Sequence, residues 1–594
     1  MTDFKTLEKD FYTYNPLVFD LSHVEKTDVI GSTYDVQFSN SICFPEFKLG
    51  FHHFIHKTKD KMEIVEELGN RKKIYLVTSL FEINIDYKEK TDSGIDYTSI
   101  NSGIKLFVKS IKPDFPPLLN RAFLKMWEIL VEFDLIPETE NFVSSHLAEG
   151  PGSFIQATIL YREMMAKLGK IKSTSNDNYY GVTLHSDHEH LLMHQEFIKY
   201  FAKEPHNRLH IMETKSLEEL KDLYGGGKNL VTAPITNGDL TKLNTIRQFA
   251  GGKVFDGKKG SSSKNIESFA KPSDLITSDG GFDWKRENLQ EQEAYKLIFG
   301  EILTALKLQK DGGNFVIKIF ETYTKITIKF IQMLRQYYSQ VYISKPYTSR
   351  ISNSEKYIVC KGFKKSSISS KIILKLEEQL ETMNINSQYQ ILDIFTDINL
   401  PDSVYNAYKQ INLDLQIKQY IGINNIIKFL NLDNFNGVEF NEYLDKQIIA
   451  AHFWNNMFLG PKLFSQIVKY FKSFDYIEYK KNNLTDNDDN LTTQSTETEP
   501  EPGSEIESET KNKKITKLSG LSRTKSAKKQ TVKTKKPTKT NQKGGGVISD
   551  TYSDTDSDTD SDIKAMIYDN TSISSTDNIV GHLNSDDEID LNKL

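Results

Sequence analysis

The sequence predicts an α/β protein whose central part is a mostly parallel sheet with helices on both faces. Between residues 113 and 363, short apolar runs alternate with longer amphipathic segments. Glycines follow the amphipathic segments, as expected at helix C-termini, and polar residues follow several of the apolar runs. The length of 594 residues allows about three to four domains, so this segment is expected to be one of several regions.

The expected strands are seven short apolar runs, at residues 141–149, 179–185, 229–235, 273–280, 313–321, 340–346 and 356–363. Two helices are clearest between them. Residues 153–169 carry apolar side chains at helical spacing and stop at Gly169, and residues 288–313 are expected to close on Gly312 and Gly313.

The rest of the chain divides by composition into three regions. Residues 1–112 form an accessory N-terminal region without a recognisable motif, and residues 364–482 look mostly helical. Its aromatic-rich segment, 451–479, is either core or a partner-binding face, with core favoured. Residues 483–594 form a tail, first basic and then acidic, that is too poor in apolar residues to fold.

Composition excludes several classes of protein. The formal net charge of -6 gives no overall basic signature, although the block 511–543 carries thirteen Lys and Arg and no acid. That block is equally consistent with phosphate binding and with a solvated tail. Cys43 and Cys360 are far apart, which argues against a disulfide framework or a thiolate zinc site. Without a signal peptide or an apolar run long enough to span a bilayer, the chain is expected to be intracellular and cytoplasmic.

A Gly-Pro-Gly corner, Gly150 to Gly152, separates the first expected strand from the helix that follows. Such a corner places backbone N–H groups beside a ligand. A dinucleotide fingerprint would need a third glycine, and the phosphate-loop candidate at 252–259 ends on lysine without Ser or Thr. S-adenosylmethionine, with its uncharged adenosine and cationic sulfur, remains as a ligand. An ordinary strand-to-helix turn remains the alternative.

Five charged residues are expected near the same edge of the sheet. Asp239 follows the third expected strand and Asp279 follows the fourth. Lys318 interrupts the apolar fifth strand, Glu355 precedes the last one, and Lys125 lies on an upstream amphipathic helix. Ligands of open parallel sheets bind at the carboxyl ends of strands, and a buried lysine requires a carboxylate or a chemical role. Each charge alone could belong to the surface, but together they predict a site.

These pieces resemble a known family. Across residues 113–363, the segments "NRAFLKMWEI", "HLAEGPGSF", "YYGVTL", "NGDLT", "DLITSDGGFDW", "GGNFVIKIF" and "KPYTSRISNSEKYIVC" occur in the order and spacing of the FtsJ/RrmJ-like ribose 2′-O-methyltransferases. They look most like the branch of eukaryotes and large DNA viruses that modifies mRNA caps. The resemblance implies a Rossmann-like methyltransferase fold with a mostly parallel, seven-stranded sheet. The Asn-, Lys- and Ile-rich composition indicates an AT-rich genome such as that of a giant virus.

The resemblance also implies the residues of the site. The catalytic set falls on Lys125, Asp279, Lys318 and Glu355, and S-adenosylmethionine would be bound by Glu149, Gly150, Pro151, Gly152, Ser153, Asp239 and Asp279. His146 stands where many members have a strand-end acid, so Glu149 is expected to take over part of that acid's work. Lys318 is expected to accept the proton of the ribose hydroxyl, with a pKa lowered by burial and by Lys125.

The implied function is S-adenosylmethionine-dependent RNA 2′-O-methylation, acting on the first transcribed nucleotide of capped mRNA. The alternatives are a noncatalytic RNA-binding or virion protein on the same scaffold, and methylation of ribosomal or transfer RNA. Expected partners are RNA and other capping or transcription proteins, with no membrane, and for a viral protein the location could be the virion or the viral factory. No metal is expected, because the donor is activated by its positive sulfur, and the histidine cluster near His190 and His194 lacks the spacing of a metal motif.

Overall fold

The computed structural model describes part of the chain, and the predicted tail, 483–594, lies outside the described residues. The described residues are 17–29, 33–40, 55, 57, 78–82, 100–184, 193–203, 206, 208–212, 231–232, 238–254, 264–281, 289–432 and 437–459. They all belong to one compact unit. None of the helices described is both long and apolar enough to cross a membrane.

A central sheet organises the described residues and has nine strands in the order β1-β11-β12-β10-β9-β3-β4-β5-β6. The strands are β1 (Leu17–Asp20), β11 (Tyr338–Lys345), β12 (Lys356–Phe363), β10 (Gln309–Ile319), β9 (Ser273–Ser278), β3 (Val143–Leu147), β4 (Asn178–Val182), β5 (Leu209–Met212) and β6 (Val231–Thr232). From β10 to β6 all neighbours run parallel, whereas β1, β11, β12 and β10 pair antiparallel. The mostly parallel α/β sheet predicted from the sequence is therefore confirmed.

The sheet has two more strands in the described residues than the seven expected. One is β1, which comes from the N-terminal region and pairs with β11 at the sheet edge. The other is β5, a run of only four residues between two polar segments. Its shortness explains why the apolar pattern alone did not identify it, because four residues are too few to distinguish a strand from a short loop.

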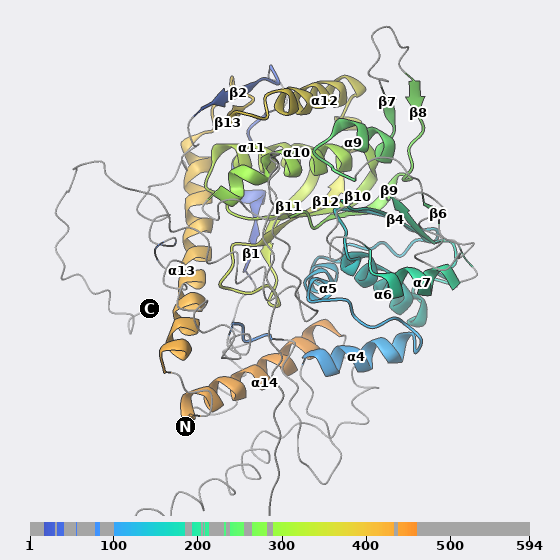
Figure 1. Cartoon of the computed structure of the whole chain (residues 1–594), viewed down its shortest axis with the longest axis vertical. Helices are drawn as coiled ribbons and strands as arrows, with labels where there is room; N and C mark the ends of the chain where they lie inside the picture. The colour runs from blue at the N-terminus through green and yellow to red at the C-terminus, as the bar shows by residue number, and fades with distance from the viewer. Residues whose placement is uncertain are drawn as a thin grey trace, which may run out of the picture. The chain divides into compact units, whose positions relative to one another are not determined.

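Helices cover both faces of the sheet (Figure 1). On one face lie α9 (Leu243–Ala250), α10 (Gln290–Leu308) and α11 (Lys325–Tyr337), with α12 (Ser370–Ile385) and the pair β2 (Val36–Ser39) and β13 (Gln390–Ile394) outside them. On the other face lie α4 (Ile100–Ile111), α5 (Ala122–Phe133), α6 (Ser153–Lys167) and α7 (Gln195–Lys203). Short elements complete the description: η1 (Leu21–His23), β7 (Gly252–Val254), β8 (Lys264–Ile266) and η5 (Lys365–Ser367).

Alternate side chains of the central strands fill two hydrophobic cores. Phe315 and Ile317 of β10 belong to the core that contains α10, α11 and α12. Val316, between them in the sequence, belongs to the core that contains α4, α5 and α6. Because successive side chains of a strand point to opposite faces, a strand buried on both sides is apolar at nearly every position. This is why the predicted strands read as continuous apolar runs.

The two helices predicted between strands differ in how well their ends were placed. Helix α6 ends at Lys167, and Gly169 follows in a left-handed conformation with φ +72°, as predicted for a C-terminal cap. Helix α10 ends earlier than predicted. It stops at Leu308, and β10 begins at Gln309, so Gly312 and Gly313 lie within the strand, beside a register shift. The glycines accommodate an irregular strand rather than a helix end.

Two long helices follow the sheet, α13 (Asp402–Leu432) and α14 (Val438–Phe458). Helix α13 runs along the β1 side of the molecule, and α14 lies below α5 in this view and meets α4 at one end (Figure 1). Phe453, Trp454 and Phe458 of α14 are buried in the same core as α4 and α5. For the described part of the aromatic-rich segment, core packing is thus confirmed.

Candidate active site

The four residues of the predicted catalytic set lie together at the carboxyl edge of the parallel strands. Lys125 Nζ lies 2.9 Å from Glu355 Oε1, and Lys318 Nζ lies 3.1 Å from Asp279 Oδ1. All four side chains are largely buried, with exposed fractions between 10% for Glu355 and 22% for Asp279. Two lysines and two carboxylates form a nearly neutral set, which lowers the cost of burying them.

The pleat of the sheet explains why these side chains lie close together. Lys318 has the same strand parity as Val316, so it points to the sheet face that α5 covers. Asp279 directly follows β9, the parallel neighbour of β10, and Ile317 is paired with Ser278. Lys125 lies in the first turn of α5, on the same face. Three separate parts of the chain therefore contribute charges to one edge.

Tyr357 connects the two ion pairs, and the sequence analysis did not identify it. Its hydroxyl lies 3.0 Å from Glu355 Oε1 and 3.3 Å from Asp279 Oδ1, and it can donate to either carboxylate. The residue is fully buried and is paired with Lys318 across β12 and β10. Strand alternation could have found it, because a residue two positions after Glu355 on a strand lies on the same face.

The charges of the set determine its protonation. Burial alone would raise the pKa of Glu355, but Lys125, Lys318 and Lys345 lower it to about 2. Burial raises the pKa of Asp279 despite the neighbouring Lys318. For Lys318, burial would lower the pKa, but the carboxylates of Asp279 and Glu355 outweigh burial and raise it above its ordinary value. Lys318 is therefore held protonated, which differs from the expected lowered pKa.

Lys345 holds the segment that carries Glu355. From the end of β11, its ammonium group donates to the backbone oxygen of Glu355 at 2.7 Å and to Asn353 Oδ1 at 2.8 Å. Ser349 Oγ lies 3.2 Å from the same nitrogen. Several donors and acceptors thus fix the turn between β11 and β12, so Glu355 enters β12 with a defined direction.

Two glycines follow Asp279, and the packing requires the first of them. A Cβ on Gly280 would lie 2.1 Å from Glu301 Oε1, whereas one on Gly281 would lie 3.5 Å from Lys318 Nζ, an ordinary contact distance. Glu301 is buried, and burial raises its pKa to about 8, so it is largely protonated at neutral pH. Gly280 thus allows the chain to pass close to Glu301 directly after Asp279.

The Gly-Pro-Gly corner is joined to β4 and to its own helix. The N–H of Gly150 donates to Thr183 Oγ1 at 3.1 Å, and Gly152 has φ +115°, a left-handed conformation that favours glycine. Pro151 accepts the N–H of His194 through its backbone oxygen at 3.0 Å. Ser153 is buried and donates to Asn120 Oδ1, so its hydroxyl is used within the protein. These hydrogen bonds fix the shape of the corner. The N–H of Gly150 and the hydroxyl of Ser153 are therefore used within the protein.

Glu149 is the acid of the corner, and only one of its two carboxyl oxygens has a hydrogen-bond partner among the described residues. Oε1 accepts the N–H of Ile155 at 2.8 Å, near the start of α6. Oε2 is buried and has no hydrogen-bond partner among the described residues, with His146 Nδ1 at 3.8 Å. Burial raises the pKa of Glu149 well above its ordinary range and lowers the pKa of His146 to about 3, so the histidine is neutral.

His146 forms a structural hydrogen-bond chain instead of replacing an acid. Its ring nitrogens lie 2.8 Å from Ser144 Oγ and 2.7 Å from Thr277 Oγ1, and the side chain is fully buried. These contacts join β3 to β9, its parallel neighbour. Since both nitrogens are engaged, the histidine serves the packing of the sheet, and Glu149 is the acid of this part of the site.

Asp239 lies at the same edge, but beside a different strand from the one expected. It is expected at the end of the third predicted strand, and it lies next to the end of β4. It follows β6 in the chain, but the neighbouring Gly238 packs against the end of β4, where a Cβ would lie 1.8 Å from the backbone oxygen of Thr183. Asp239 Oδ1 accepts from the N–H of Thr241 at 2.8 Å and from its hydroxyl at 2.7 Å. The carboxylate is thereby oriented at the end of β4, one strand from the corner.

The residues of this edge fit S-adenosylmethionine, because their carboxyl groups offer hydrogen-bond acceptors and negative charge. The cofactor carries hydroxyl and amino donors together with a positive sulfur. Glu149 offers a buried carboxyl oxygen without a partner among the described residues, and Asp279 offers a partly exposed carboxylate beside Lys318. Buried acceptors are rarely left unsatisfied, so Glu149 Oε2 indicates a position where a donor belongs. Among the described residues, no cluster of His, Cys, Asp and Glu has the arrangement of a metal site.

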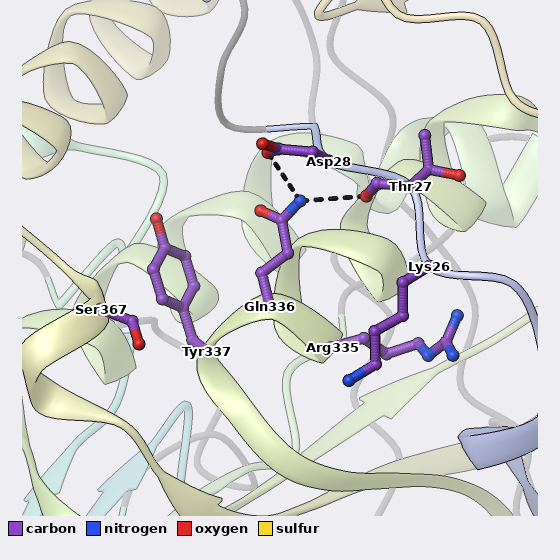
Figure 2. Close-up of a pocket in the computed structure, with 7 residues that line it drawn as sticks. All are labelled: Lys26, Thr27, Asp28, Arg335, Gln336, Tyr337 and Ser367. Atoms are coloured by element: carbon purple, nitrogen blue, oxygen red, sulfur yellow. Dashed lines mark hydrogen bonds between the residues drawn. The ribbon is translucent and has the colours of Figure 1, made fainter.

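A cavity of about 570 Å³ lies elsewhere, at the opposite edge of the sheet (Figure 2). Its lining includes Lys26, Arg335 and Tyr337, and Tyr337 precedes the start of β11. Strand β11 has eight residues and ends at Lys345, so its two ends lie roughly 23 Å apart at about 3.3 Å per residue. Figure 2 shows Gln336 donating to Thr27 and Asp28, so this polar lining holds the N-terminal segment on α11.

Comparison with known proteins assigns the segment that carries the site. Residues 118–363 match the family model of FtsJ-like methyltransferases. Uncharacterized protein L511 of Acanthamoeba polyphaga mimivirus is 30% identical over 297 residues, which are 48% of this chain and 32% of that protein. Probable methyltransferase EP424R of African swine fever virus (isolate Pig/Kenya/KEN-50/1950) is 27% identical over 333 residues, which are 53% of this chain and 66% of that protein.

A cellular relative matches a shorter stretch. The cap-specific mRNA (nucleoside-2'-O-)-methyltransferase 1 of Dictyostelium discoideum is 39% identical over 127 residues, which are 21% of this chain and 15% of that protein. In none of these three comparisons does the match cover more than 66% of the relative's own length. The likeness thus concerns a domain, and it includes viral as well as cellular proteins.

Proposed function

We propose that this chain, whose residues 118–363 are an FtsJ-like methyltransferase domain, transfers a methyl group from S-adenosylmethionine to a ribose 2′-oxygen of RNA. The preferred substrate is the first transcribed nucleotide of capped mRNA. One observation carries the proposal: two lysines and two carboxylates, contributed by distant parts of the chain, pair at the carboxyl edge of the sheet. A protein that only used the scaffold would not need such a buried charged set.

The chemistry requires a base and a defined direction of attack. When bound, the cofactor supplies a methyl group on a positively charged sulfur. Lys318 would take the proton of the ribose hydroxyl, while Lys125 and Glu355 hold the other side of the set in place. The charge of Asp279 supports the raised pKa of Lys318, so neutralising that charge would lower the pKa. Lys318 would then release its own proton to solvent, and the neutral amine could accept the proton of the ribose hydroxyl.

The cap preference is supported by the Dictyostelium relative, which is named a cap-specific mRNA (nucleoside-2'-O-)-methyltransferase. Methylation of ribosomal or transfer RNA remains the second candidate. The comparison of capped and uncapped transcripts of the same sequence distinguishes them. Methyl transfer that depends on the cap supports the first candidate, and equal transfer to both transcripts supports the second.

Replacing Lys318 tests the reaction itself. In Lys318→Ala, we expect transfer of labelled methyl to capped RNA to fall by about 10²-fold or more, because a positioned general base typically contributes this much. Calorimetry with S-adenosylmethionine should show that the variant still binds the cofactor. Near-wild-type turnover in the variant would contradict the assignment of the base.

A matched control lies on the same strand. Lys310 of β10 pairs with Asp274 at 2.6 Å, at the opposite end of the strand from Lys318. Lys310→Ala should leave turnover within about twofold of the wild type, because surface ion pairs contribute little. A wild-type protein that binds no S-adenosylmethionine would favour a noncatalytic RNA-binding or virion role for the same fold.

A further inference from the structure

Helix α13 lies outside the segment that matches the family, yet it carries a row of buried amides toward the active-site edge. Asn412, Gln416 and Gln419 follow one another at helical spacing, so they share one face of the helix. All three side chains are buried. Their partners are the segment after β10 and the turn between β11 and β12, which follow Lys318 and precede Glu355 respectively.

The first contact holds the segment after β10. Asn412 Oδ1 accepts from Thr322 Oγ1 at 2.5 Å, and its amide nitrogen donates to the backbone oxygen of Thr322 at 2.9 Å. Gln416 Nε2 donates to the hydroxyl of Tyr323. Thr322 is four residues beyond Lys318, and therefore these bonds fix the exit of the strand that carries the proposed base.

The second contact holds the turn before β12, residues 346–355, which we term the Glu355 turn. Gln419 Nε2 donates to the backbone oxygen of Ser352 at 2.9 Å. Gly422 lies one helical step further, and a Cβ there would be 2.3 Å from Ile351 Cγ2. The helix backbone at Gly422 therefore lies close to the side chain of Ile351, four residues before Glu355.

The use of amides at these positions is informative. Buried amides stabilise a fold only when they are fully bonded, whereas apolar side chains of the same size would pack there without that requirement. Hydrogen bonds are directional, however, and a bonded amide fixes the position of its partner more narrowly than an apolar contact does. The row therefore defines where the two segments lie rather than adding burial.

We propose that α13 is a positioning element of the active site, with Asn412 and Gln419 fixing the two segments that set Lys318 and Glu355 relative to each other. The inference rests on the proposed function, since it assigns these residues a task in that reaction. They are positioning residues that act through Thr322 and Ser352. Because a displacement of about 1 Å can cost about 10²-fold in rate, their removal should affect turnover more than binding.

The test uses the full-length chain with Gln419→Met, which keeps the length of the side chain and removes its donor. We expect kcat for methyl transfer to capped RNA to fall about tenfold or more, with KM for S-adenosylmethionine and the melting temperature nearly unchanged. Hydrogen exchange followed by mass spectrometry should show faster exchange in residues 349–355. The matched control is Gln410→Met, an exposed amide on the same helix, bonded to Asp414, which should change none of these.

Asn412→Leu is the second variant. It removes a different contact of α13, so the proposal can still be tested if Gln419→Met does not fold. It should accelerate exchange in residues 320–324 and lower kcat in the same manner. Faster exchange with unchanged kcat in both variants would overturn the proposal, because α13 would then hold the segments without serving the reaction. Unchanged exchange would also overturn it. A wild-type protein inactive on RNA would refute the proposed function, and the exchange data would still decide whether α13 holds the two segments.

Discussion

Lys318 shows how the protein's own charges define the state of a single residue. Its ammonium group is 3.1 Å from Asp279, and the carboxylates around it raise its pKa although burial alone would lower it. The sequence could predict that Lys318, Asp279, Lys125 and Glu355 lie at one edge, because strand ends meet there. Which lysine pairs with which acid, and the role of Tyr357 between them, depends on distances of a few ångströms that no sequence pattern specifies.

Glu149 leads to a prediction about cofactor affinity and pH. Burial holds the pKa of Glu149 well above its ordinary range, so the carboxyl stays protonated to a higher pH than an exposed glutamate would. If the cofactor binds the ionised form, its affinity should rise with pH, by about tenfold for each unit that the pKa falls on binding. Glu149→Gln should weaken cofactor binding, leave turnover at saturation nearly intact and remove this pH dependence.

Calorimetric titration of S-adenosylhomocysteine between pH 6 and pH 9 measures the effect. Glu138→Gln is a suitable control, because Glu138 is an exposed acid paired with Lys170. An affinity and a pH profile that are the same in Glu149→Gln and in the wild type would show that Glu149 serves only the corner, through its bond to Ile155.

At the scale of elements, the turn between β11 and β12 depends on three helices. Glu128 of α5 accepts the backbone N–H groups of Tyr347 at 2.6 Å and of Thr348 at 2.8 Å. Trp454 of α14 donates to the same carboxylate at 2.9 Å, and α13 holds the turn further along. Lys125 lies one turn before Glu128, so the helix that carries one lysine of the predicted catalytic set also anchors the turn that precedes Glu355.

Glu128 predicts how stability depends on pH. Burial raises its pKa from about 4.5 in the unfolded chain to about 7 in the folded protein. Because the pKa is raised in the folded protein, the contribution of Glu128 to the free energy of unfolding is complete below about pH 4.5. This contribution is lost as the pH rises to about 7. The loss amounts to roughly 3 kcal/mol at about 1.4 kcal/mol per unit.

Urea unfolding of the wild type and Glu128→Gln between pH 5 and pH 8 checks this. The glutamine variant should be less stable at pH 5, because its amide places a donor against the donors of Tyr347 and Thr348. With rising pH, the wild type should lose its advantage over the variant. A difference in the free energy of unfolding that stays constant over this range would contradict the prediction.

At the scale of the whole molecule, residues 118–363, which match the family model, share their cores with segments on both sides of them. Leu17, Leu21 and Val29 from the N-terminal region are buried with the sheet and α11. Trp454 and Phe458 from α14 are buried with α4 and α5. The backbone oxygen of Phe458 also accepts the indole N–H of Trp127 at 2.8 Å. The boundaries at residues 112 and 363 remain predictions from the sequence. In the structure, both hydrophobic cores include residues from the two sides of these boundaries.

This packing predicts that residues 118–363 produced alone fold poorly, since both cores would expose large apolar side chains to water. We expect such a fragment to be aggregated or to lack a cooperative melting transition. A longer fragment that ends at residue 459 should melt cooperatively. Differential scanning calorimetry of the two purified fragments measures this. A cooperative transition in the short fragment would show that the flanking segments are dispensable for folding.

The sequence by itself determined the α/β class, the parallel strands and the residues at their carboxyl ends, because apolar periodicity and strand order act locally and can be read along the chain. It also supplied the family resemblance over residues 113–363, which the family match confirms. The tertiary structure decided the rest. The four charges pair, Glu149 keeps an unsatisfied oxygen, and α13 reaches the turn before Glu355 only because residues distant in sequence are packed together. Such contacts depend on three-dimensional packing, whose geometry a linear pattern does not contain.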